Sequence, residues 1–410
     1  MTRIALIPSS YPPSLGGVEE LTRHLALSLV EAGDQVEVWT GHPDDAAPET
    51  AEIRDGMVVR RLPMPLPATN WSALRRSAAT GCRTLFSLRS AAAAFRPEVL
   101  HVQCFGPNGT YATALSRITG IPLVISLQGE TLMDDADIFE TSRVLRASLR
   151  LGLRTASAVT GCSAFTLADA EKRFGLSVGE GRVVPNGVEV RTTGFVSPSA
   201  GASSLAGPGR PYIFALGRVV EKKGFDLLVA AFAAMGPGRA VADLVIAGTG
   251  EAMEALRRQA VESGVADSVH FVGRLDREEV AEAMAGALLF VMPSRLEPFG
   301  IVILEAWRAG VAVVASSRGG APEFVRNDLD GVLVDPFDTA ALAAVLESLV
   351  SDEERRVRIA RSGKVRVEEF GWPVVAGQYR EIYSAVTASR GARTRSSDDV
   401  QGSHQGESVG

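Results

Sequence analysis

The chain has 410 residues, of which 46% are hydrophobic and 22% charged, a composition typical of folded globular domains and not of disordered chains. Its formal net charge is −6, with 42 Lys and Arg against 48 Asp and Glu, which disfavours a protein that binds the phosphate backbone of nucleic acids. The three cysteines, Cys82, Cys104 and Cys162, lack CxxC spacing and therefore predict neither a disulfide framework nor a zinc site.

Apolar runs of strand length alternate with helix-length segments along the chain. In the first half the predicted strands are 3–8, 35–40, 57–62, 99–102, 122–127 and 157–161, and the predicted helices are 18–32, 74–95 and 165–174. In the second half the strands are 212–216, 242–247, 268–272, 288–292, 312–315 and 331–334, and the helices are 224–235, 251–263, 277–285, 301–309 and 339–350. Continuous apolar strands joined by crossover helices predict an α/β protein with two Rossmann-like, doubly wound domains.

Composition also predicts the domain boundaries. The first domain is expected over 1–196 and the second over 211–370, because residues 197–210 are rich in Gly, Pro, Ser and Ala, as linkers are. A last amphipathic helix is expected over 371–387, followed by a disordered polar tail over 389–410. The apolar run at the start is too short for a signal peptide, and no run reaches the roughly 18 apolar residues of a spanning helix. We therefore expect a cytoplasmic protein.

Open α/β sheets bind ligands at the carboxyl ends of their strands, which draws attention to the loop after strand 288–292. Pro298 suits a helix start, and Gly300 would let a phosphate approach the free N–H groups there. Glu305 lies about one and a half turns further along, too far to cap the helix. A carboxylate beside an anion site can accept hydrogen bonds from sugar hydroxyls. The alternative is that Glu297 and Glu305 are ordinary solvated carboxylates.

The loop after strand 212–216 supplies cations at the same end of the sheet. It contains Arg218, Lys222 and Lys223, which could neutralise a pyrophosphate, Arg as a bidentate fork and Lys as a point charge. The chain has only four lysines, so an adjacent pair before Gly224 is suggestive. Chance placement is the alternative.

Together these residues resemble the signature of the family-4 retaining glycosyltransferases, and the resemblance extends over nearly the whole chain. The matching segments are Gly16-Gly17-Val18-Glu19, Pro185-Asn186-Gly187-Val188, Gly217-Arg218…Lys223-Gly224, Glu297-Pro298-Phe299-Gly300…Glu305 and Gly319-Gly320-Ala321-Pro322-Glu323. The two glutamates around Pro-Phe-Gly are the specific part of the match. The resemblance implies the GT-B fold, in which two Rossmann-like domains face a central cleft and the helix 371–387 crosses back to the first domain.

The resemblance also implies roles for residues of the second domain. Glu297 would contact hydroxyls of the donor sugar, and Glu305 would contact the ribose of the nucleotide. Arg274 and Leu275 would line the pocket for the base. The groups implied to hold the donor diphosphate are Arg218, Lys223 and the backbone amides of Gly300, Ile301 and Val302.

In the first domain the resemblance implies that Gly16 and Gly17 approach the diphosphate through their backbone. Cations and helix amides already in place would stabilise the departing nucleotide electrostatically, so no protein nucleophile is required. In this family a donor phosphate oxygen is thought to take the acceptor's proton on the same face of the sugar, which retains the anomeric configuration.

The sequence departs from the family pattern at three positions. His101-Val102-Gln103 stands where members often have His-x-His, Gln128 where many have a histidine, and Glu189 where Asp is usual. Gln128 retains hydrogen bonding but cannot titrate near neutral pH, so we expect it to position substrate. We expect His101 to be an interior histidine whose ring nitrogens are satisfied.

Two weaker motifs, a partial dinucleotide fingerprint and two DxD pairs, do not change this prediction. Gly248-Thr249-Gly250 has Met253 at the third glycine position of a dinucleotide fingerprint. The DxD pairs at 135–137 and 328–330 are interpreted as solvated acids, and no metal site is expected.

Arginines gather on helical segments of the first domain, including 74–95. Those that would share one helix face are Arg143, Arg146, Arg150 and Arg154. A solvated helix face is one interpretation. The other is peripheral contact with anionic lipid at the inner face of the membrane.

The sequence thus predicts a retaining, metal-independent glycosyltransferase without a bound cofactor. Its donor would be a nucleotide-diphospho-sugar such as a UDP- or GDP-sugar, and its acceptor a hydroxyl of a small molecule, glycan or lipid-linked compound. A GT-B sugar-nucleotide epimerase or hydrolase, a nicotinamide-dependent oxidoreductase and a non-catalytic sensor of phosphorylated sugars remain alternatives.

Overall fold

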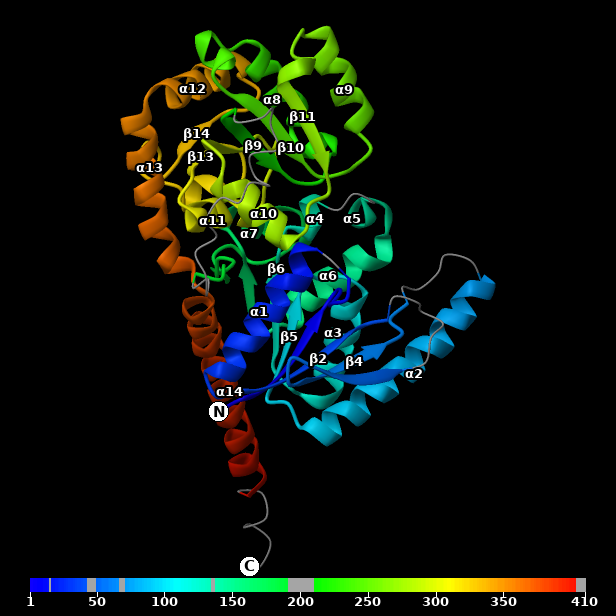
Figure 1. The fold of residues 1–410 in the computed structure, drawn as a ribbon. Coiled ribbons are helices and arrows are strands. Elements are labelled where there is room, and N and C mark those ends of the chain that lie inside the picture. Colours follow the sequence, from blue (N-terminus) through cyan, green and yellow to red (C-terminus); the bar gives the residue numbers. More distant parts are fainter. Residues whose placement is uncertain (15, 43–48, 66–70, 134–136, 191–209, 403–410) are drawn as a thin grey trace, which may run out of the picture. The chain divides into compact units, whose positions relative to one another are not determined.

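In the computed structural model, each of two units is built around a mainly parallel sheet (Figure 1). The structure describes residues 1–14, 16–42, 49–65, 71–133, 137–190 and 210–402, with no side chains described for 71–79 and 391–402. Contacts assign Met1–Pro185 and Trp372–Gly410 to unit 1, and Asn186–Gly371 to unit 2. The predicted linker lies outside the described residues except for Arg210.

Unit 1 contains an eight-stranded sheet within its described residues. The strands are β1 (Arg3–Pro8), β2 (Gln35–Gly41), β3 (Thr50–Arg54), β4 (Met57–Leu62), β5 (Val99–Gln103), β6 (Leu123–Leu127), β7 (Ala158–Gly161) and β8 (Gly181–Val183). Their order is β3-β4-β2-β1-β5-β6-β7-β8, and β3 pairs antiparallel with β4 whereas the other neighbours are parallel. The strand order therefore reverses between β1 and β5.

The helices of unit 1 include one that comes from the end of the chain. They are α1 (Gly17–Glu31), α2 (Trp71–Phe95), α3 (Pro107–Thr119), α4 (Glu130–Met133), α5 (Ile138–Thr141), α6 (Arg143–Thr155), α7 (Ala164–Phe174) and α14 (Trp372–Gly402). The α14 helix packs against α1, where the rings of His24 and Trp372 stack with centroids 5.7 Å apart. The helix continues to Gly402, although the composition led us to expect disorder from Ser389.

Unit 2 has the Rossmann strand order. Its strands are β9 (Tyr212–Leu216), β10 (Asp243–Ala247), β11 (Val269–Gly273), β12 (Leu289–Met292), β13 (Ala312–Ser316) and β14 (Val332–Val334). They are all parallel, in the order β11-β10-β9-β12-β13-β14. The helices are α8 (Phe225–Ala233), α9 (Met253–Glu262), α10 (Arg277–Ala285), α11 (Ile301–Ala309), α12 (Thr339–Ser351) and α13 (Glu353–Arg366). The prediction of two doubly wound α/β units is confirmed.

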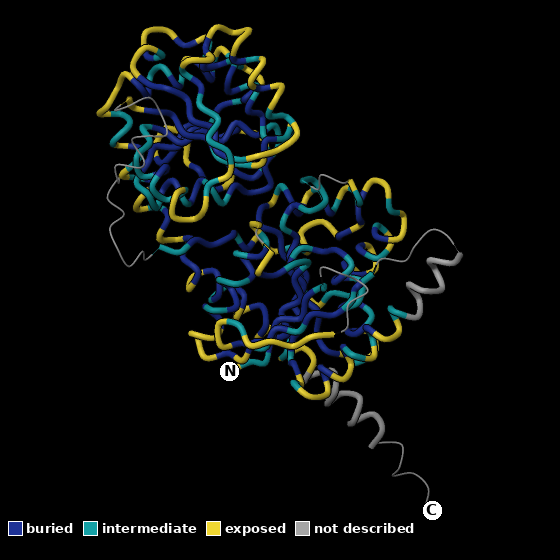
Figure 2. Tube along the Cα trace, turned by 45° about the vertical axis from the view of Figure 1, so that its right-hand side comes forward, coloured by how far each residue is buried: buried dark blue, intermediate teal, exposed yellow. Residues whose placement is uncertain are grey.

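Burial explains why these strands read as continuous apolar runs. The central strands of both sheets are dark in Figure 2, whereas the edge strands β3 and β8 of unit 1 are mostly exposed. In unit 2 the order reverses between β9 and β12, and open α/β sheets bind ligands at the carboxyl ends of the strands where the order reverses. Ligand-binding loops are therefore expected after β9 and β12.

A glycine in one of these loops tests how closely they pack. Gly224 has φ +69°, and a Cβ there would lie 2.1 Å from the carbonyl oxygen of Pro293. Gly264 has nearly the same φ, +67°, but a Cβ there would meet no other group within 4 Å. We expect Gly264→Ala to cost about 1–2 kcal/mol of unfolding free energy from its left-handed backbone alone. Gly224→Ala should cost more, because the loop after β12 must also move. Calorimetry of the unit 2 transition measures both, and equal losses would contradict the close packing.

Candidate active site

Two loops of unit 2 meet at the carboxyl ends of β9 and β12. Lys223, in the 3-10 turn η2 (Glu221–Lys223), donates from Nζ to Oε2 of Glu297 at 2.6 Å. The buried Ser294 donates to the same oxygen at 2.9 Å. The side chains of Lys223 and Glu297 are only 19% and 10% exposed, so water screens their attraction less than it would at the surface. The structure therefore brings together two residues that the sequence had assigned to different parts of a donor.

A second ion pair ties the same loops together. The guanidinium of Arg295 donates to both carboxylate oxygens of Asp226, at 2.7 and 2.6 Å. The amide of Arg295 donates to the carbonyl of Lys222 at 3.0 Å. Burial alone would raise the pKa of Asp226, but the Arg295 guanidinium and the backbone amides of Asp226 and Leu227 together lower it. Sequence analysis did not single out either residue, because their partnership appears only when β9 and β12 are adjacent.

Gly300 lies directly before α11, three residues after Glu297 in the sequence. It has φ +94°, and a Cβ there would lie 2.7 Å from the sulfur of Met292, so glycine suits the position for two reasons. The helix begins at Ile301, and the first N–H groups of a helix have no partner four residues back. Those N–H groups and the positive end of the helix dipole make this end of α11 suitable for an anion.

The backbone of Glu297 is fixed by the turn after β13. The amide of Gly320 donates to the carbonyl of Glu297 at 2.8 Å. A Cβ on Gly319, which has φ +106°, would lie 2.1 Å from that same carbonyl oxygen. The Gly-Gly pair therefore allows the close backbone approach that holds Glu297 in place.

The other predicted residues of unit 2 follow neighbouring strands. Arg218 is exposed in the loop directly after β9, and Glu305 is half-buried on α11 near the charge of Arg308. Arg274 is exposed and Leu275 half-buried after β11, which is separated from β9 by β10.

The predicted residues of unit 1 also lie after strands. Gly16 precedes α1 and Gly17 is its first residue, in the connection that follows β1. Gln128 comes directly after β6. All three residues lie within unit 1.

A buried polar network lies behind Gln128. His101 Nδ1 is 2.6 Å from the hydroxyl of Tyr383 on α14, and its Nε2 is 2.7 Å from that of Ser126. Burial lowers the pKa of His101 to about 3, so the ring is neutral. The expectation of an interior histidine with satisfied nitrogens is confirmed. Tyr383 was missed by sequence analysis, since 282 positions separate it from His101.

A carboxyl group beside Gln128 was also missed. Glu130 accepts hydrogen bonds from the backbone amides of Phe105 and Gln128, both at 2.6 Å. Burial raises the pKa of Glu130 to about 7, although the two amides favour its charged form. Glu130 therefore links the loop after β5 to the loop after β6.

The solvated-acid interpretation is wrong for one DxD residue. Asp330 is fully buried and accepts from the backbone amide and the Nε of Arg326, at 2.7 and 2.5 Å. A local backbone turn, invisible in composition, buries it. Asp135 lies outside the described residues. Within the described residues there is no cluster of three or more His, Cys, Asp or Glu side chains that could hold a metal ion.

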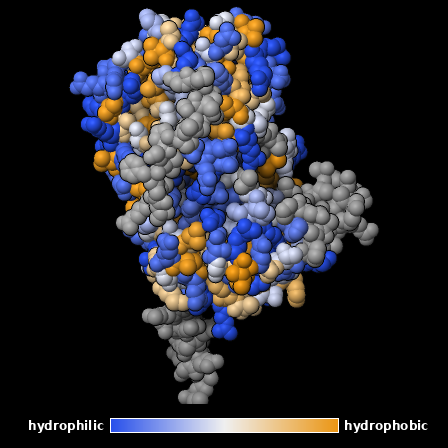
Figure 3. Space-filling view, viewed as in Figure 1, coloured by the Kyte–Doolittle hydropathy of each residue, from blue (hydrophilic) through white to orange (hydrophobic). Residues whose placement is uncertain are grey.

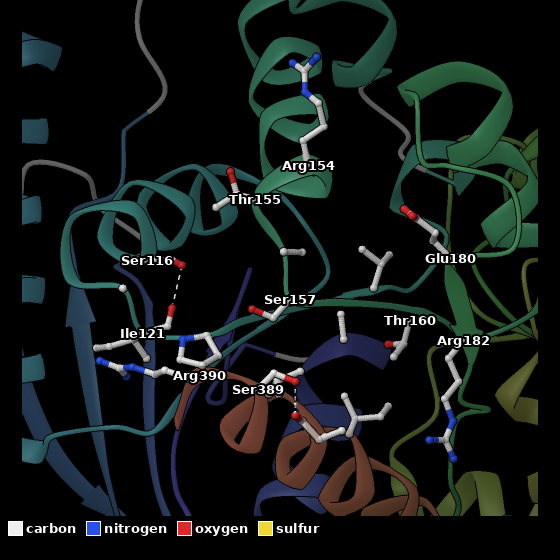
Figure 4. A pocket seen from close by; sticks show the side chains of 18 of the residues that line it. Ser116, Ile121, Arg154, Thr155, Ser157, Thr160, Glu180, Arg182, Ser389 and Arg390 are labelled. Carbon is white, nitrogen blue, oxygen red and sulfur yellow. Dashed lines mark hydrogen bonds between the residues drawn. The ribbon is translucent and has the colours of Figure 1, made fainter. Parts of the chain in front are cut away.

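A cavity of about 1080 Å³ in unit 1 lies away from these residues, beside the segments that lead into β6 and β7 (Figure 4). Arg154 and Arg390 line it but point in different directions, so they do not converge on a common ligand. The cavity lies toward the amino ends of these strands, whereas Gln128 lies at the carboxyl end of β6.

Comparisons with known proteins find two matching family models, one for each half of the chain. Residues 16–187 match the family "Glycosyl transferase 4-like domain", and residues 200–366 match "Glycosyl transferases group 1". The chain is 29% identical to a glycogen synthase of Mycobacterium tuberculosis over 95% of this chain and 96% of that protein. A long apolar helix of the kind that spans a bilayer does not occur among the described residues.

Solved structures share the fold. Sucrose-phosphate synthase from Thermosynechococcus elongatus has a TM-score of 0.75 and 24% identity, covering 95% of this chain and 100% of that one. Anabaena HepE in complex with UDP and glucose has a TM-score of 0.70 and 20% identity, covering 94% of this chain and 100% of that one.

Two buried groups predict opposite pH dependences for the stability of unit 1. The pKa of His101 is lowered from 6.5 to about 3, so below pH 6.5 only the unfolded state takes up the proton, and stability falls as pH falls. The pKa of Glu130 is raised from 4.5 to about 7, so between these values only the folded state keeps the proton, and stability falls as pH rises. Each slope is at most about 1.4 kcal/mol per pH unit, and they oppose one another where they overlap.

We expect single variants to separate the two contributions to the pH dependence of the unfolding free energy. Glu130→Gln should leave a chain whose unit 1 loses stability as the pH is lowered below about 6.5, the unfolded-state pKa of histidine. In His101→Asn, unit 1 should lose stability as the pH rises toward 7, the folded-state pKa of Glu130. Hydrogen exchange of β5 and β6 amides, corrected for intrinsic rates, measures both. Unchanged slopes in both variants would show that these groups titrate alike in the folded and unfolded states.

Proposed function

Because the chain belongs to the family-4 glycosyltransferases, which have the GT-B fold, we propose that it transfers a sugar from a nucleotide-diphospho-sugar to a hydroxyl acceptor. We further propose that the transfer retains the anomeric configuration and needs no metal. The observation that carries the proposal is the contact of Lys223 with Glu297 beside the N-terminus of α11, where the strand order of unit 2 reverses.

The proposed diphosphate site consists of positive charge held in place before the reaction. Breaking the bond between the sugar and the diphosphate leaves negative charge on the nucleotide. Lys223, Arg218 and the first amides of α11, on Gly300, Ile301 and Val302, would stabilise that charge. Glu297 already fixes the ammonium group of Lys223, so little reorganisation is needed as charge develops.

The remaining contacts are proposed for the other parts of the donor. The carboxylate of Glu297 would also accept hydrogen bonds from hydroxyls of the sugar, and Glu305 from the ribose. Arg274 and Leu275 would contact the base. From unit 1, the backbone of Gly16 and Gly17 would approach the diphosphate, and Gln128 would contact a substrate hydroxyl.

The chemistry of the transfer requires only one proton to move. The acceptor hydroxyl attacks the anomeric carbon as the nucleoside diphosphate departs, and an oxygen of the departing phosphate takes the hydroxyl proton. Attack on the face from which the nucleotide leaves retains the configuration. Uridine and guanosine diphosphate sugars are the proposed donors, and the UDP and glucose held by HepE support the first of these.

A thermal-shift screen across UDP-, GDP-, ADP- and dTDP-sugars tests the donor site. A true donor raises the unfolding temperature by mass action, and we expect one of the four nucleotides to do so. In Arg218→Ala, transfer from that donor should fall about a hundredfold, the usual loss when one charge-stabilising group is removed. Product analysis by NMR gives the anomeric configuration, and assays with EDTA test metal independence.

Arg258→Ala is the matched control, because Arg258 is an exposed arginine of the same unit on α9. It should leave both the shift and the turnover unchanged. Donor consumption without an acceptor would indicate a hydrolase or epimerase, and binding without any turnover would indicate a sensor. Equal losses in both arginine variants would contradict the proposed diphosphate site.

We also propose a peripheral contact between unit 1 and anionic lipid. The α6 helix buries Leu145, Leu149 and Leu153 and leaves Arg143 and Arg150 exposed. On the face seen in Figure 3, hydrophobic residues lie dispersed among hydrophilic ones, so membrane contact through that face would depend on charge.

Vesicle co-sedimentation tests the lipid contact. Binding to anionic vesicles should weaken about a hundredfold in Arg143→Gln/Arg146→Gln/Arg150→Gln, since each arginine near the surface contributes about 1 kcal/mol. A triple Gln variant with the same charge change in unit 2, at 257, 258 and 361, is the control. Equal sedimentation with neutral and anionic vesicles would exclude the contact.

A further inference from the structure

A continuous chain of hydrogen bonds connects α14 to Gln128. The hydroxyl of Tyr383 lies 2.6 Å from Nδ1 of His101, and Nε2 of His101 lies 3.2 Å from Nε2 of Gln103. Gln128 in turn donates from Nε2 to Oε1 of Gln103 at 3.0 Å. His101 and Gln103 are fully buried, so water cannot substitute for a missing partner in this part of the chain.

The chain has a single direction. An amide nitrogen can only donate, so the contact of Gln103 Nε2 with His101 Nε2 is a hydrogen bond only if this ring nitrogen carries no proton, and the hydroxyl of Ser126, 2.7 Å away, then faces the same nitrogen as a donor. The neutral ring then holds its proton on Nδ1 and donates it to the oxygen of Tyr383. Every N–H along the series therefore points from Gln128 toward α14, and bonds aligned in this way strengthen one another.

The direction decides which atom Gln128 offers to a ligand. Its nitrogen is engaged with Gln103, whereas its Oε1 is buried and has no hydrogen-bond partner among the described residues. A buried carbonyl oxygen without a partner costs free energy unless a ligand supplies the donor. A hydroxyl group is a donor of the right kind.

We propose that His101 is a positioning residue whose Nδ1–H tautomer, held by Tyr383, fixes the amide of Gln128 so that its oxygen accepts a hydrogen bond from a substrate hydroxyl. This inference rests on the proposed function, because it takes the ligand to be a sugar. The inference goes beyond the proposed function because it assigns to α14 the control of the Gln128 amide, which lies at the carboxyl end of β6.

The opposite tautomer would reverse the series. With the proton on Nε2, His101 would donate to Ser126, and Gln103 would have to turn its oxygen toward the ring. Gln103 would then donate to Gln128, whose nitrogen would be left to face the ligand. A hydroxyl would still bind, but as an acceptor, in a different position from the one the Nδ1–H tautomer selects.

Tyr383→Phe tests the tautomer directly. Phenylalanine leaves an Nδ1–H without an acceptor, which is costlier than leaving a bare nitrogen, so the proton should move to Nε2. Two-bond ¹H–¹⁵N spectra of ¹⁵N-histidine-labelled protein distinguish the tautomers. We expect Nδ1–H for His101 in the unmodified chain and Nε2–H in Tyr383→Phe. An Nε2–H ring in the unmodified chain overturns the proposal.

A double-mutant cycle tests whether the effect passes through Gln128. With the donor found in the screen, Tyr383→Phe should lower kcat about fivefold to tenfold, the equivalent of one hydrogen bond. In a Gln128→Ala background the same change should have no further effect. Losses that multiply would overturn the proposal, since Tyr383 would then act on activity without Gln128.

Arg380→Met is the matched control for damage to helix packing. Arg380 also lies on α14 and donates to Asp34 at 2.9 Å, outside the series. This variant should leave both the His101 spectrum and kcat unchanged, and a loss equal to that of Tyr383→Phe would overturn the proposal. If no donor sugar is transferred by any variant, the proposed function fails, whereas the spectrum still decides the tautomer.

Discussion

The ion pair of Lys223 with Glu297 is the interaction on which the candidate site of unit 2 depends. It joins the loops after β9 and β12, the two strands between which the order of the sheet reverses. The Arg295–Asp226 ion pair and the hydrogen bond from the amide of Arg295 to the carbonyl of Lys222 join the same two loops. Pairing two charges away from water is costly unless other hydrogen bonds complete them, and Ser294 supplies one. The glycines at 224 and 319 permit the backbone approach that this pairing requires.

Strands buried on both faces could be predicted from the sequence almost to the residue. The predicted limits of β1 and β9 are those of the structure, because continuous apolar runs mark such strands. The edge strand β3 was missed because its residues are mostly exposed and carry no apolar run. The α3 helix was missed because its Gly and Thr residues are weak helix formers, and the polar α13 shows little amphipathic pattern.

Residue types at the site could be predicted, but their partners could not. Arg218, Lys223 and Glu297 stand out because they are charged residues in loops that follow buried strands, where open α/β sheets bind ligands. Nothing local indicates that Lys223 pairs with Glu297, since the contact spans 74 positions. The same limit applies to His101 and Tyr383. Sequence reasoning correctly made His101 an interior residue, yet its effect on Gln128 depends on a helix from the other end of the chain.

The two units place different chemical groups at the carboxyl ends of their strands, and under the proposed function these groups would contact different parts of the substrates. In unit 2 the loops after β9 and β12 carry Arg218 and the Lys223–Glu297 ion pair, and the N-terminus of α11 follows, which is the arrangement that we propose for the diphosphate. In unit 1 the side chain of Gln128 joins a series of neutral groups that includes a histidine kept uncharged by burial, while the Glu130 carboxyl accepts from its backbone amide. A neutral chain of amides binds a hydroxyl by direction and not by charge, so its polarity must be fixed from behind. Under our proposal, Gln128 can therefore act where many family members have a histidine, because Gln103, His101 and α14 fix the direction of its amide.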